Sequence, residues 1–487
     1  MKTPNYFSLP LLLNSKKYYF LLFVLCVISR LFTSINYLED IDSMRFALSL
    51  FDYNILDLRP HFPGYPVFCF FAKIIYLIIG SVQFTFSIIG GISIFIIIYY
   101  SDLLFKLLMG KTSHYLSMLL FISPLLWNLG NRYMSDLFGL SLLVMVIYYL
   151  LIYINTKNTK QLFVGFFVFG LLAGVRVSFL PFLIPIFFYV LFILPKKNVL
   201  QSLFVLFFGI LIWIIPLILI SGLDDLYNIS INHISGHFYK WGGSILTNES
   251  SYLFRFQKII ESIWADGLGG WWKGRNIITL FVSMGWILSF CFSLLNIHKF
   301  KKCKSRKLIF LLIISIIFYF IWIFLFQNII YKPRHVIPFI PFALIISSIG
   351  ISTMIKTHKI FKIFIYTFFC CLFALTSYLN WQHKSPSAIS QVKSYIIEDE
   401  SDLKIFCSSN LINTYMKKHK NSDKIVFLNM KSFDRIKKYY DSGYSIYSTK
   451  NLNHLKMNLE FKGVFYHNPY VNRLWSSMRI YKYKNEK

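Results

Sequence analysis

Long apolar runs recur along most of this chain, and they constrain its fold more than any other feature. About eleven runs approach the roughly 20 residues that a helix needs to cross a bilayer. Apolar residue types make up 56% of the 487 residues, and the mean hydropathy is +0.57. Charged residues make up 15%, whereas an ordinary soluble protein carries about 25%. The sequence therefore predicts a mainly α-helical, polytopic membrane protein.

The positions of the apolar runs give the expected spans. In chain order they are 18–35, 84–108, 115–129, 137–153, two short helices flanking Gly174-Val175-Arg176, then 200–220, 277–295, 308–326, 336–354 and 363–379. Two long loops, 37–83 and 221–275, separate these spans. The apolar part of the first loop, 65–80, predicts a helix lying at the membrane interface. No A-x-A cleavage site follows the first run, so we expect an uncleaved first transmembrane helix.

Basic residues in the short connections indicate the orientation. One side carries Lys16, Lys17, Lys106, Lys111, Lys157, Lys160, Lys196, Lys197, the 299–307 cluster, Lys356, Lys359 and Lys362. By the positive-inside rule this side is cytoplasmic, so the two long loops and the C-terminal tail face outward. Lys273 and Arg275 flank a span on the outer side and count mildly against this arrangement. The net charge of +29 then reflects topology and anionic lipid rather than a nucleic-acid partner.

After Asn380 the composition becomes polar. Strands are expected at 402–406, 424–428 and 444–447, and helices at 411–418 and 433–440. Such alternation predicts a small soluble α/β domain over 381–487, on the outer side, after a transmembrane domain over 1–380. The seven cysteines form no CxxC motif, so neither a disulfide framework nor a zinc site follows.

Carboxylates and cations gather on the predicted outer side. Glu39, Asp40 and Asp42 directly follow the first span, and Asp136 opens a later helix. The cations on this side are Arg45, Arg59, Arg132, Arg176 and Arg334. Transfer of a sugar from a polyprenyl phosphate needs a carboxylate near the acceptor hydroxyl as general base. It also needs cations or hydrogen-bond donors for the leaving phosphate.

Four short motifs carry a family resemblance. Asp42-Ser43-Met44-Arg45-Phe46-Ala47 resembles the D-E-x-R-Y-A stretch of lipid A aminoarabinose transferases and the related stretch of protein O-mannosyltransferases. The segment 61–65, His-Phe-Pro-Gly-Tyr, is similar to their H-P-P-[GL]-Y turn. The segment 132–136, Arg-Tyr-Met-Ser-Asp, resembles their R-Y-x-x-x-D with one residue fewer before the acid. The segment 333–338, Pro-Arg-His-Val-Ile-Pro, is similar to their P-R-Y-x-x-P.

The chain therefore resembles the GT-C superfamily of membrane glycosyltransferases over about 31–350, and 232–243 resembles an uncharacterised bacterial branch. The resemblance implies that Asp42 is the catalytic carboxylate, and we assign Asp136 as a second catalytic residue. Residues expected to bind substrate are Asp40, Arg45, His61, Arg132, Arg176, His233, His237 and Arg334. The chain departs from the family at Ser43, where many relatives have Glu, which weakens any mechanism needing adjacent acids.

Each candidate also has a structural interpretation. Asp42 and Asp136 could cap helices, Asp40 could be one of the surface acids that commonly follow a span, and His61 could be an interfacial residue. His233 and His237, four residues apart, would share one face of a helix and could bind substrate, pack at the interface or hold a metal. Since no third ligand is evident, no cofactor is expected, although a divalent metal stays possible.

These features predict a hexosyl- or pentosyltransferase of the bacterial inner membrane with an outward-facing active site. It would move a sugar, with inversion, from a polyprenyl-phosphate donor to a glycan, lipid or protein acceptor. The alternative of another class is a transporter or flippase for a lipid-linked saccharide. Transporters favour inverted repeats and broken midplane helices, and no repeat is visible here. An O-antigen polymerase or ligase and a catalytically inactive subunit are further alternatives.

Overall fold

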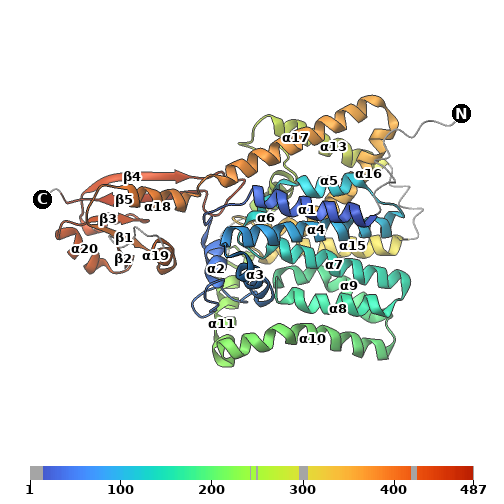
Figure 1. The fold of residues 1–487 in the computed structure, drawn as a ribbon, viewed down its shortest axis with the longest axis horizontal. Helices are drawn as coiled ribbons and strands as arrows, with labels where there is room; N and C mark the ends of the chain where they lie inside the picture. The colour runs from blue at the N-terminus through green and yellow to red at the C-terminus, as the bar shows by residue number, and fades with distance from the viewer. Residues whose placement is uncertain (1–14, 242, 248–250, 296–304, 418–424, 486–487) are drawn as a thin grey trace. The chain divides into compact units, whose positions relative to one another are not determined.

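The computed structural model describes residues 15–241, 243–247, 251–295, 305–417 and 425–485 (Figure 1). The chain forms two compact units. The first contains Met1–Ser34 and Ser49–Asn380, and the second contains Ile35–Leu48 and Trp381–Lys487. A short N-terminal segment, with the acidic residues that follow the first helix, therefore belongs to the same unit as the tail. The basic residues at 299–304 lie outside the described residues.

The first unit is helical. Its helices are α1 (Ser15–Phe32), α3 (Pro66–Ile79), α4 (Val82–Met109), α5 (His114–Ile122), α6 (Pro124–Asn131), α7 (Asp136–Thr156), α8 (Thr159–Ala173), α9 (Leu180–Ile193), α10 (Lys196–Ser221), α11 (Leu223–Ser235), α12 (Tyr252–Glu261), α13 (Ile278–Leu295), α15 (Arg306–Phe326), α16 (Ile340–Thr357) and α17 (Lys359–Lys384), whose last turn enters the second unit. Short 3-10 or π-helical turns are η1 (Val177–Phe179), η2 (Gly236–Lys240), η3 (Ile245–Thr247), η4 (Ser262–Gly267) and η5 (Pro333–Phe339).

The helices coincide with the predicted apolar runs, and the expected multi-pass membrane architecture is confirmed. Among the described residues, seven helical stretches are long and apolar enough to cross a membrane, so the expected count of about eleven spans is not established. The run 115–129 is two short helices rather than one. Pro124 starts α6 after the extended residue Ser123, because proline cannot continue the hydrogen-bond ladder of α5.

Helix α4 lies at the centre of the first unit and packs against α1 and α7. Small residues permit some of the closest approaches between helices. A Cβ atom on Gly90 of α4 would lie 1.7 Å from the carbonyl oxygen of Gly130 in α6. These two helices can therefore touch only because Gly90 has no side chain.

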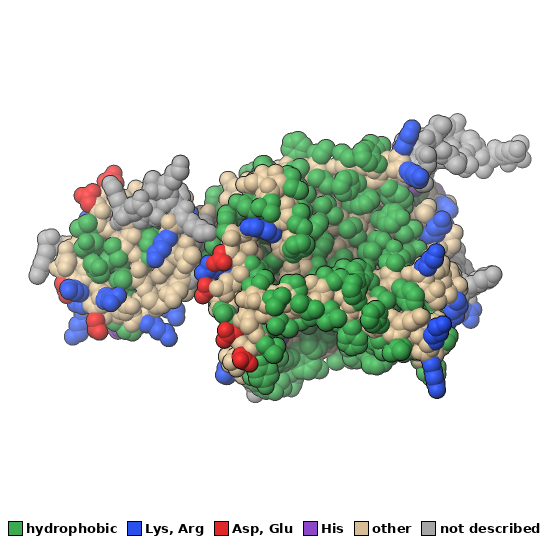
Figure 2. Space-filling model, turned by 60° about the horizontal axis from the view of Figure 1, so that its bottom comes forward, with side chains coloured by type: hydrophobic (Ala, Val, Ile, Leu, Met, Phe, Trp, Pro, Cys, Tyr) green, Lys and Arg blue, Asp and Glu red, His purple; other side chains and the backbone are tan. Residues whose placement is uncertain are grey.

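The surface of the first unit has the character that a lipid environment requires. Apolar side chains cover the face shown in Figure 2, and Lys and Arg side chains gather at one end of the unit. Helix α10 exposes most of its length, with Leu219 79% exposed. Such large exposed apolar surfaces are not stable in water and fit burial in hydrocarbon.

The second unit contains a five-stranded sheet of order β2-β1-β3-β5-β4. Its strands are β1 (Lys404–Ser408), β2 (Ile425–Asn429), β3 (Ser445–Ser448), β4 (Leu459–Tyr466) and β5 (Ser477–Tyr483). Strand β1 pairs in parallel with β2 and β3, whereas β5 is antiparallel to β3 and β4. The expected small α/β domain is therefore present. Its helices are α2 (Ile41–Ser49), α18 (Ala388–Glu398), α19 (Asn410–Lys417) and α20 (Phe433–Asp441).

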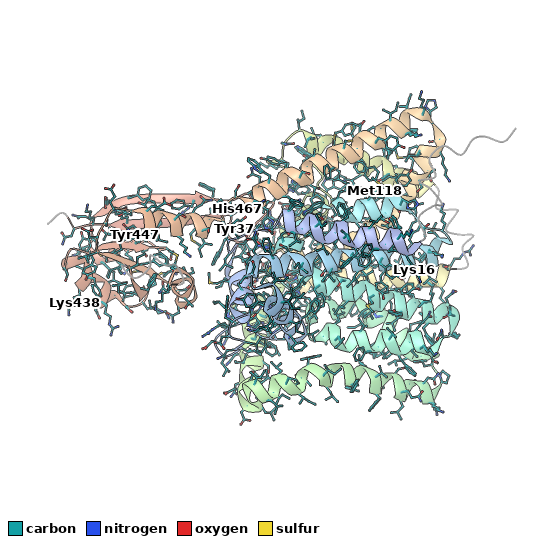
Figure 3. The ribbon with its side chains drawn as sticks, in the orientation of Figure 1. Lys16, Tyr37, Met118, Lys438, Tyr447 and His467 are labelled. Atoms are coloured by element: carbon teal, nitrogen blue, oxygen red, sulfur yellow. The ribbon has the colours of Figure 1, made fainter. Side chains whose placement is uncertain are left out.

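Alternating residues of the strands fill two apolar cores, one on each face of the sheet. Phe406 of β1 and Tyr447 of β3 belong to the core that also contains residues of α18 and α19; Tyr447 is labelled in Figure 3. Ile405 and Ile446 point to the opposite core, which α20 covers. Met44 and Leu48 of α2 belong to the first of these cores, so the N-terminal segment is an integral part of this unit.

Candidate functional site

A buried ion-pair cluster lies in the first unit at the start of α7. The Asp136 carboxylate is 2.7 Å from Nη2 of Arg176 and 3.6 Å from Nε of Arg334. The three side chains are 1%, 7% and 6% exposed. The structure thus brings together three residues that are far apart in the sequence and that were all predicted as site residues.

Local structure fixes each member of this cluster. Asp136 is in the first turn of α7, where the helix dipole favours a negative charge. Arg176 lies in the irregular connection between α8 and η1 and crosses α7 at Gly139, where a Cβ atom would be 2.8 Å from Cβ of Arg176. Arg334 is the second residue of η5, and the Tyr319 hydroxyl holds that turn by donating to the His335 carbonyl at 2.9 Å.

The cluster has unused polar atoms. Apart from the ion pairs, no hydrogen bond with a described residue reaches Nε of Arg176 or either carboxylate oxygen of Asp136. A guanidinium group has five N–H donors arranged to match a phosphate or carboxylate. The cluster can therefore receive an anionic oxygen at Arg176 while Asp136 balances part of its charge.

A row of aromatic side chains continues from Arg176. The guanidinium carbon of Arg176 is 5.9 Å from the Tyr65 ring centroid, and the Tyr65 hydroxyl is 3.0 Å from Nε2 of His61. The His61 ring stacks on His233, with centroids 5.9 Å apart, and His233 contacts the edge of Trp241 at 4.9 Å. His61 and His233, both predicted to bind substrate, are therefore neighbours.

His237 lies in the π-helical turn η2, and Arg132 directly follows α6. The π-helical turn η2 follows α11, and Nε2 of His237 is 2.9 Å from the Phe326 carbonyl oxygen. Burial lowers the pKa of His237, with this carbonyl opposing the shift and Lys332 adding to it. Arg132 is 7% exposed.

Among the described residues, no three His, Cys, Asp or Glu side chains are close enough to hold a metal ion.

The remaining predicted acids lie in the second unit, on and before α2. Oδ1 of Asp40 accepts from the Ser43 backbone N–H at 2.8 Å, so Asp40 is a buried cap of α2 and not the surface acid that its structural interpretation expected. Asp42 is in the first turn of α2, 2% exposed, and its Oδ1 is 3.4 Å from Nη1 of Arg45. Asp42 is thus a buried carboxylate at the start of a helix rather than a surface acid.

The segment before α2 is fixed by residues from the tail. Oε1 of Glu39 is 2.8 Å from Nε2 of His383, and both side chains are fully buried. Nδ2 of Asn472 donates to the Glu39 carbonyl at 2.7 Å, and the Ser387 hydroxyl donates to the Leu38 carbonyl. The position of Asp42 therefore depends on contacts with the tail.

Sequence reasoning missed residues that shape the first unit. Arg255 of α12 is 1% exposed and donates to the carbonyls of Phe324, Gly243 and Gln327 at 2.9, 2.7 and 2.9 Å. Arg30 of α1 is fully buried, with its guanidinium 4.0 Å from the Trp127 ring centroid. A lone arginine among apolar residues was the available signal in both cases, since such residues are costly without partners.

Comparison with known proteins gives a match in fold. No family model and no curated protein sequence matches the chain. The crystal structure of ArnT from Cupriavidus metallidurans bound to undecaprenyl phosphate has a TM-score of 0.53 and 10% identity, covering 95% of this chain and 97% of that chain. The apo structure of the same protein has a TM-score of 0.51 and 9% identity, covering 96% and 98%.

The expected mainly α-helical, multi-pass fold with a small C-terminal sheet domain is therefore confirmed as a fold like that of ArnT. At this level of identity the likeness is one of fold.

Proposed function

We propose that this chain is a membrane glycosyltransferase that takes a sugar from a polyprenyl-phosphate donor and transfers it to an acceptor hydroxyl. The observation that carries the proposal is the buried Asp136–Arg176–Arg334 cluster within a fold like that of ArnT over 95% of the chain. The crystal structure of ArnT contains bound undecaprenyl phosphate. Buried arginines in a membrane protein need a functional or structural reason, and a lipid phosphate supplies one.

The proposed chemistry is a single displacement at the anomeric carbon. Asp42 accepts the proton of the acceptor hydroxyl, and the hydroxyl oxygen forms a bond to the anomeric carbon. The bond from that carbon to the phosphate oxygen breaks, and polyprenyl phosphate leaves with the electron pair. Arg176 and Arg334 stabilise the negative charge that develops on the phosphate, and the sugar configuration inverts. This scheme is compatible with a hexose or a pentose as the transferred sugar. It is also compatible with a glycan, a lipid or a protein as the acceptor.

The membrane setting follows the charge distribution. Lys and Arg side chains gather at one end of the first unit (Figure 2), and we assign that end to the cytoplasm of a bacterial cell. On this assignment, we propose that the Asp136 cluster, Asp42 and the second unit all face outward from the inner membrane. A lipid-linked donor would present its sugar there.

The test compares two variants of full-length protein in nanodiscs. Donor binding is measured with undecaprenyl-phosphate sugars, and turnover is measured as release of undecaprenyl phosphate in the presence of envelope extract as the acceptor source. Asp42→Asn should lower turnover by about 10²- to 10⁴-fold, the contribution of a general base, with donor affinity nearly unchanged. Arg334→Ala should weaken both turnover and donor binding.

Asp225→Asn is the matched control, because Asp225 is an exposed carboxylate in α11 and should behave as wild type. Equal loss of donor binding in Asp42→Asn and Arg334→Ala would make Asp42 a structural residue. Mass spectrometry of envelope glycans and lipids, from cells with and without the chain, identifies the product. No difference between those cells, and no release of undecaprenyl phosphate, would contradict the proposed activity.

A further inference from the structure

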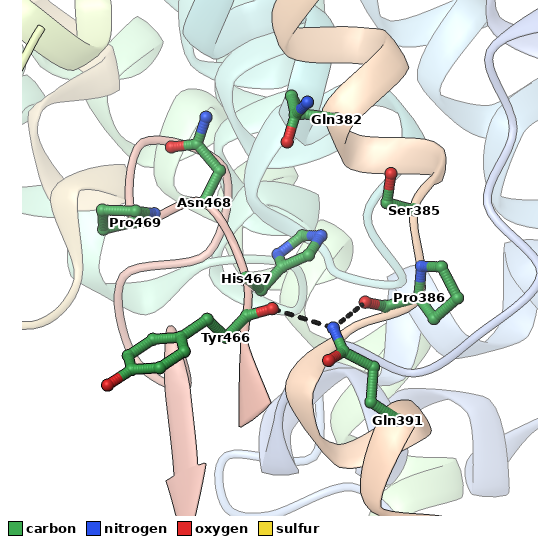
Figure 4. Close-up of a pocket in the computed structure, with 8 residues that line it drawn as sticks. All are labelled: Gln382, Ser385, Pro386, Gln391, Tyr466, His467, Asn468 and Pro469. Carbon is green, nitrogen blue, oxygen red and sulfur yellow. Dashed lines mark hydrogen bonds between the residues drawn. The ribbon is translucent and has the colours of Figure 1, made fainter. Parts of the chain in front are cut away.

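A pocket of about 420 Å³ lies in the second unit, between the end of α17 and the connection that follows β4. Figure 4 shows the His467 imidazole in its middle, Gln382 and Ser385 on one side, and Asn468 with Pro469 on the other. Pockets that hold small ligands have volumes of roughly 300–1,000 Å³. This pocket is therefore large enough for a small ligand, and none of its lining residues has a role in the proposed chemistry.

Hydrogen bonds hold the two walls of the pocket in place. Nε2 of Gln391 donates to the Pro386 carbonyl and to the Tyr466 carbonyl, both at 2.8 Å (Figure 4). Oδ1 of Asn468 accepts from the Tyr470 backbone N–H at 2.9 Å, which orients its amide. The binding surface is thus formed before any ligand arrives, and a ligand would not have to order it.

The lining residues carry neutral polar groups. Of the residues that the structure describes, no Lys, Arg, Asp or Glu lines the pocket. Burial lowers the pKa of His467, although nearby Glu39 and the backbone at Gln382 and Ser385 oppose the shift, so the imidazole is neutral at pH 7. A neutral imidazole has one donor and one acceptor, and each side-chain amide has both. Charged ligands would find no counter-ion here.

Two of these amides have unused capacity. No hydrogen bond with a described residue is made by the Gln382 side chain or by Nδ2 of Asn468. Proline rings at Pro386 and Pro469 add apolar surface beside them. Sugars present hydroxyl groups that both donate and accept, next to apolar C–H faces, so they match this lining better than a phosphate or a purely apolar ligand would.

The pocket is built onto the segment that carries Asp42. The His467 ring lies 6.1 Å from the Tyr37 ring in an edge contact (Figure 3). His383, next to Gln382 in α17, forms the buried pair with Glu39 at 2.8 Å. All of these residues belong to the second unit. A ligand in the pocket would therefore be held by the same unit that positions the proposed base.

We infer that this pocket binds an uncharged sugar residue of the acceptor. That this sugar belongs to the acceptor rests on the proposed function. That the pocket binds a neutral saccharide does not. The pocket selects the acceptor by one of its sugar units, whereas the lipid phosphate is proposed to bind arginines of the first unit. Its amides and imidazole hydrogen-bond the sugar hydroxyls, and its proline rings contact the C–H face.

The experiment measures saccharide binding to the full-length chain in nanodiscs, with no donor present. Saturation-transfer NMR is used with maltose, methyl α-mannobioside and N,N′-diacetylchitobiose as neutral probes, and glucose 6-phosphate as the charged comparison. At least one neutral probe should bind the wild type. Asn468→Ala and Gln382→Ala should each weaken that binding by about five- to tenfold, the loss expected for one hydrogen bond. Asn453→Ala, an exposed amide of the same unit outside the pocket, should bind as wild type.

Absence of binding by every neutral probe would overturn the inference, as would wild-type affinity in both pocket variants. Tighter binding of glucose 6-phosphate than of the neutral probes would also overturn it. The outcome is independent of turnover. Saccharide binding without any sugar transfer would leave the inference standing and contradict the proposed function. Sugar transfer with an unchanged KM for the acceptor in Asn468→Ala would contradict the inference and leave the proposed function standing.

Discussion

Arg176 is the residue on which the buried cluster of the first unit depends. Its guanidinium is 2.7 Å from Asp136, and both side chains are at most 7% exposed. Removing one partner of such a pair leaves an uncompensated buried charge and costs about 3–5 kcal/mol. A direct substitution of either residue would therefore mix loss of folding with loss of binding. A better test moves Arg176 while keeping its charge.

The first prediction uses Gly139, the residue of α7 against which Arg176 lies. In Gly139→Ala the new Cβ would be 2.8 Å from Cβ of Arg176, so the arginine must shift away from Asp136. Loss of a hydrogen bond to a charged group costs about 1.5–3 kcal/mol. The affinity for undecaprenyl phosphate in nanodiscs should therefore fall by at least about tenfold, as measured by thermophoresis.

Gly165→Ala in α8 is the control for this variant. There the nearest atoms are side-chain atoms of Tyr149 and Leu150, at 3.1 and 3.2 Å, and none belongs to the cluster. Phosphate affinity should stay at the wild-type level. An unchanged affinity in Gly139→Ala, or an equal fall in the two variants, would mean that Arg176 does not contact the phosphate.

At the scale of elements, helix α2 combines two roles. Its first turn carries Asp42, and its later residues Met44 and Leu48 lie in the apolar core of the second unit. A nine-residue helix is too short to be stable alone. Its order must therefore come from the core into which it packs, and so must the position of Asp42.

The second prediction tests this dependence with Met44→Ala. Met44 is fully buried, and truncating a buried methionine to alanine costs about 2–5 kcal/mol. Hydrogen exchange of β1 (Lys404–Ser408) should become faster, although this strand is far from Met44 in the sequence. Exchange measured by mass spectrometry on the intact chain reports on this strand directly.

Met118→Ala is the matched control, because Met118 of α5 is 48% exposed and lies in the first unit (Figure 3). Exchange in β1 should not change in this variant. Protection of β1 that stays at the wild-type level in Met44→Ala would show that α2 is not part of the core of the second unit.

Elements that depend on local sequence were predictable, whereas contacts between distant segments were not. The apolar runs predicted the helices, and strand–helix alternation predicted β1, α19, β2, α20 and β3 to within about two residues. Strands β4 and β5 and helix α18 were not predicted; most of β4 is exposed and lacks a buried face. The pairing of Glu39 with His383, 344 positions away, leaves no periodic signal. Asp136, Arg176 and Arg334 were predicted one by one, but their contact follows from the fold.

At the scale of the whole molecule, charge and hydropathy act together. The apolar surface of the first unit demands a membrane, and basic side chains gather at one end of it (Figure 2). The chain passes between the helix-rich first unit and the sheet-containing second unit at three points, after Ser34, after Leu48 and after Asn380. Because the second unit takes up the Asp42 segment, the side of the membrane that it occupies also decides where the proposed base can act.

The last prediction therefore concerns topology. Asp225 of α11 should face outward and Lys197 of α10 should face the cytoplasm, because basic residues of short connections remain inside. Both residues are exposed, so a cysteine at either position can be labelled without disturbing the core. In a background in which the seven native cysteines are replaced, a membrane-impermeant maleimide should label Asp225→Cys in intact spheroplasts. Lys197→Cys should be labelled only after permeabilisation, and Asp225→Cys should gain no further label then.

The reverse pattern would put the second long loop in the cytoplasm. The proposed transfer at the outer face would then be wrong, whatever the chemistry of Asp42.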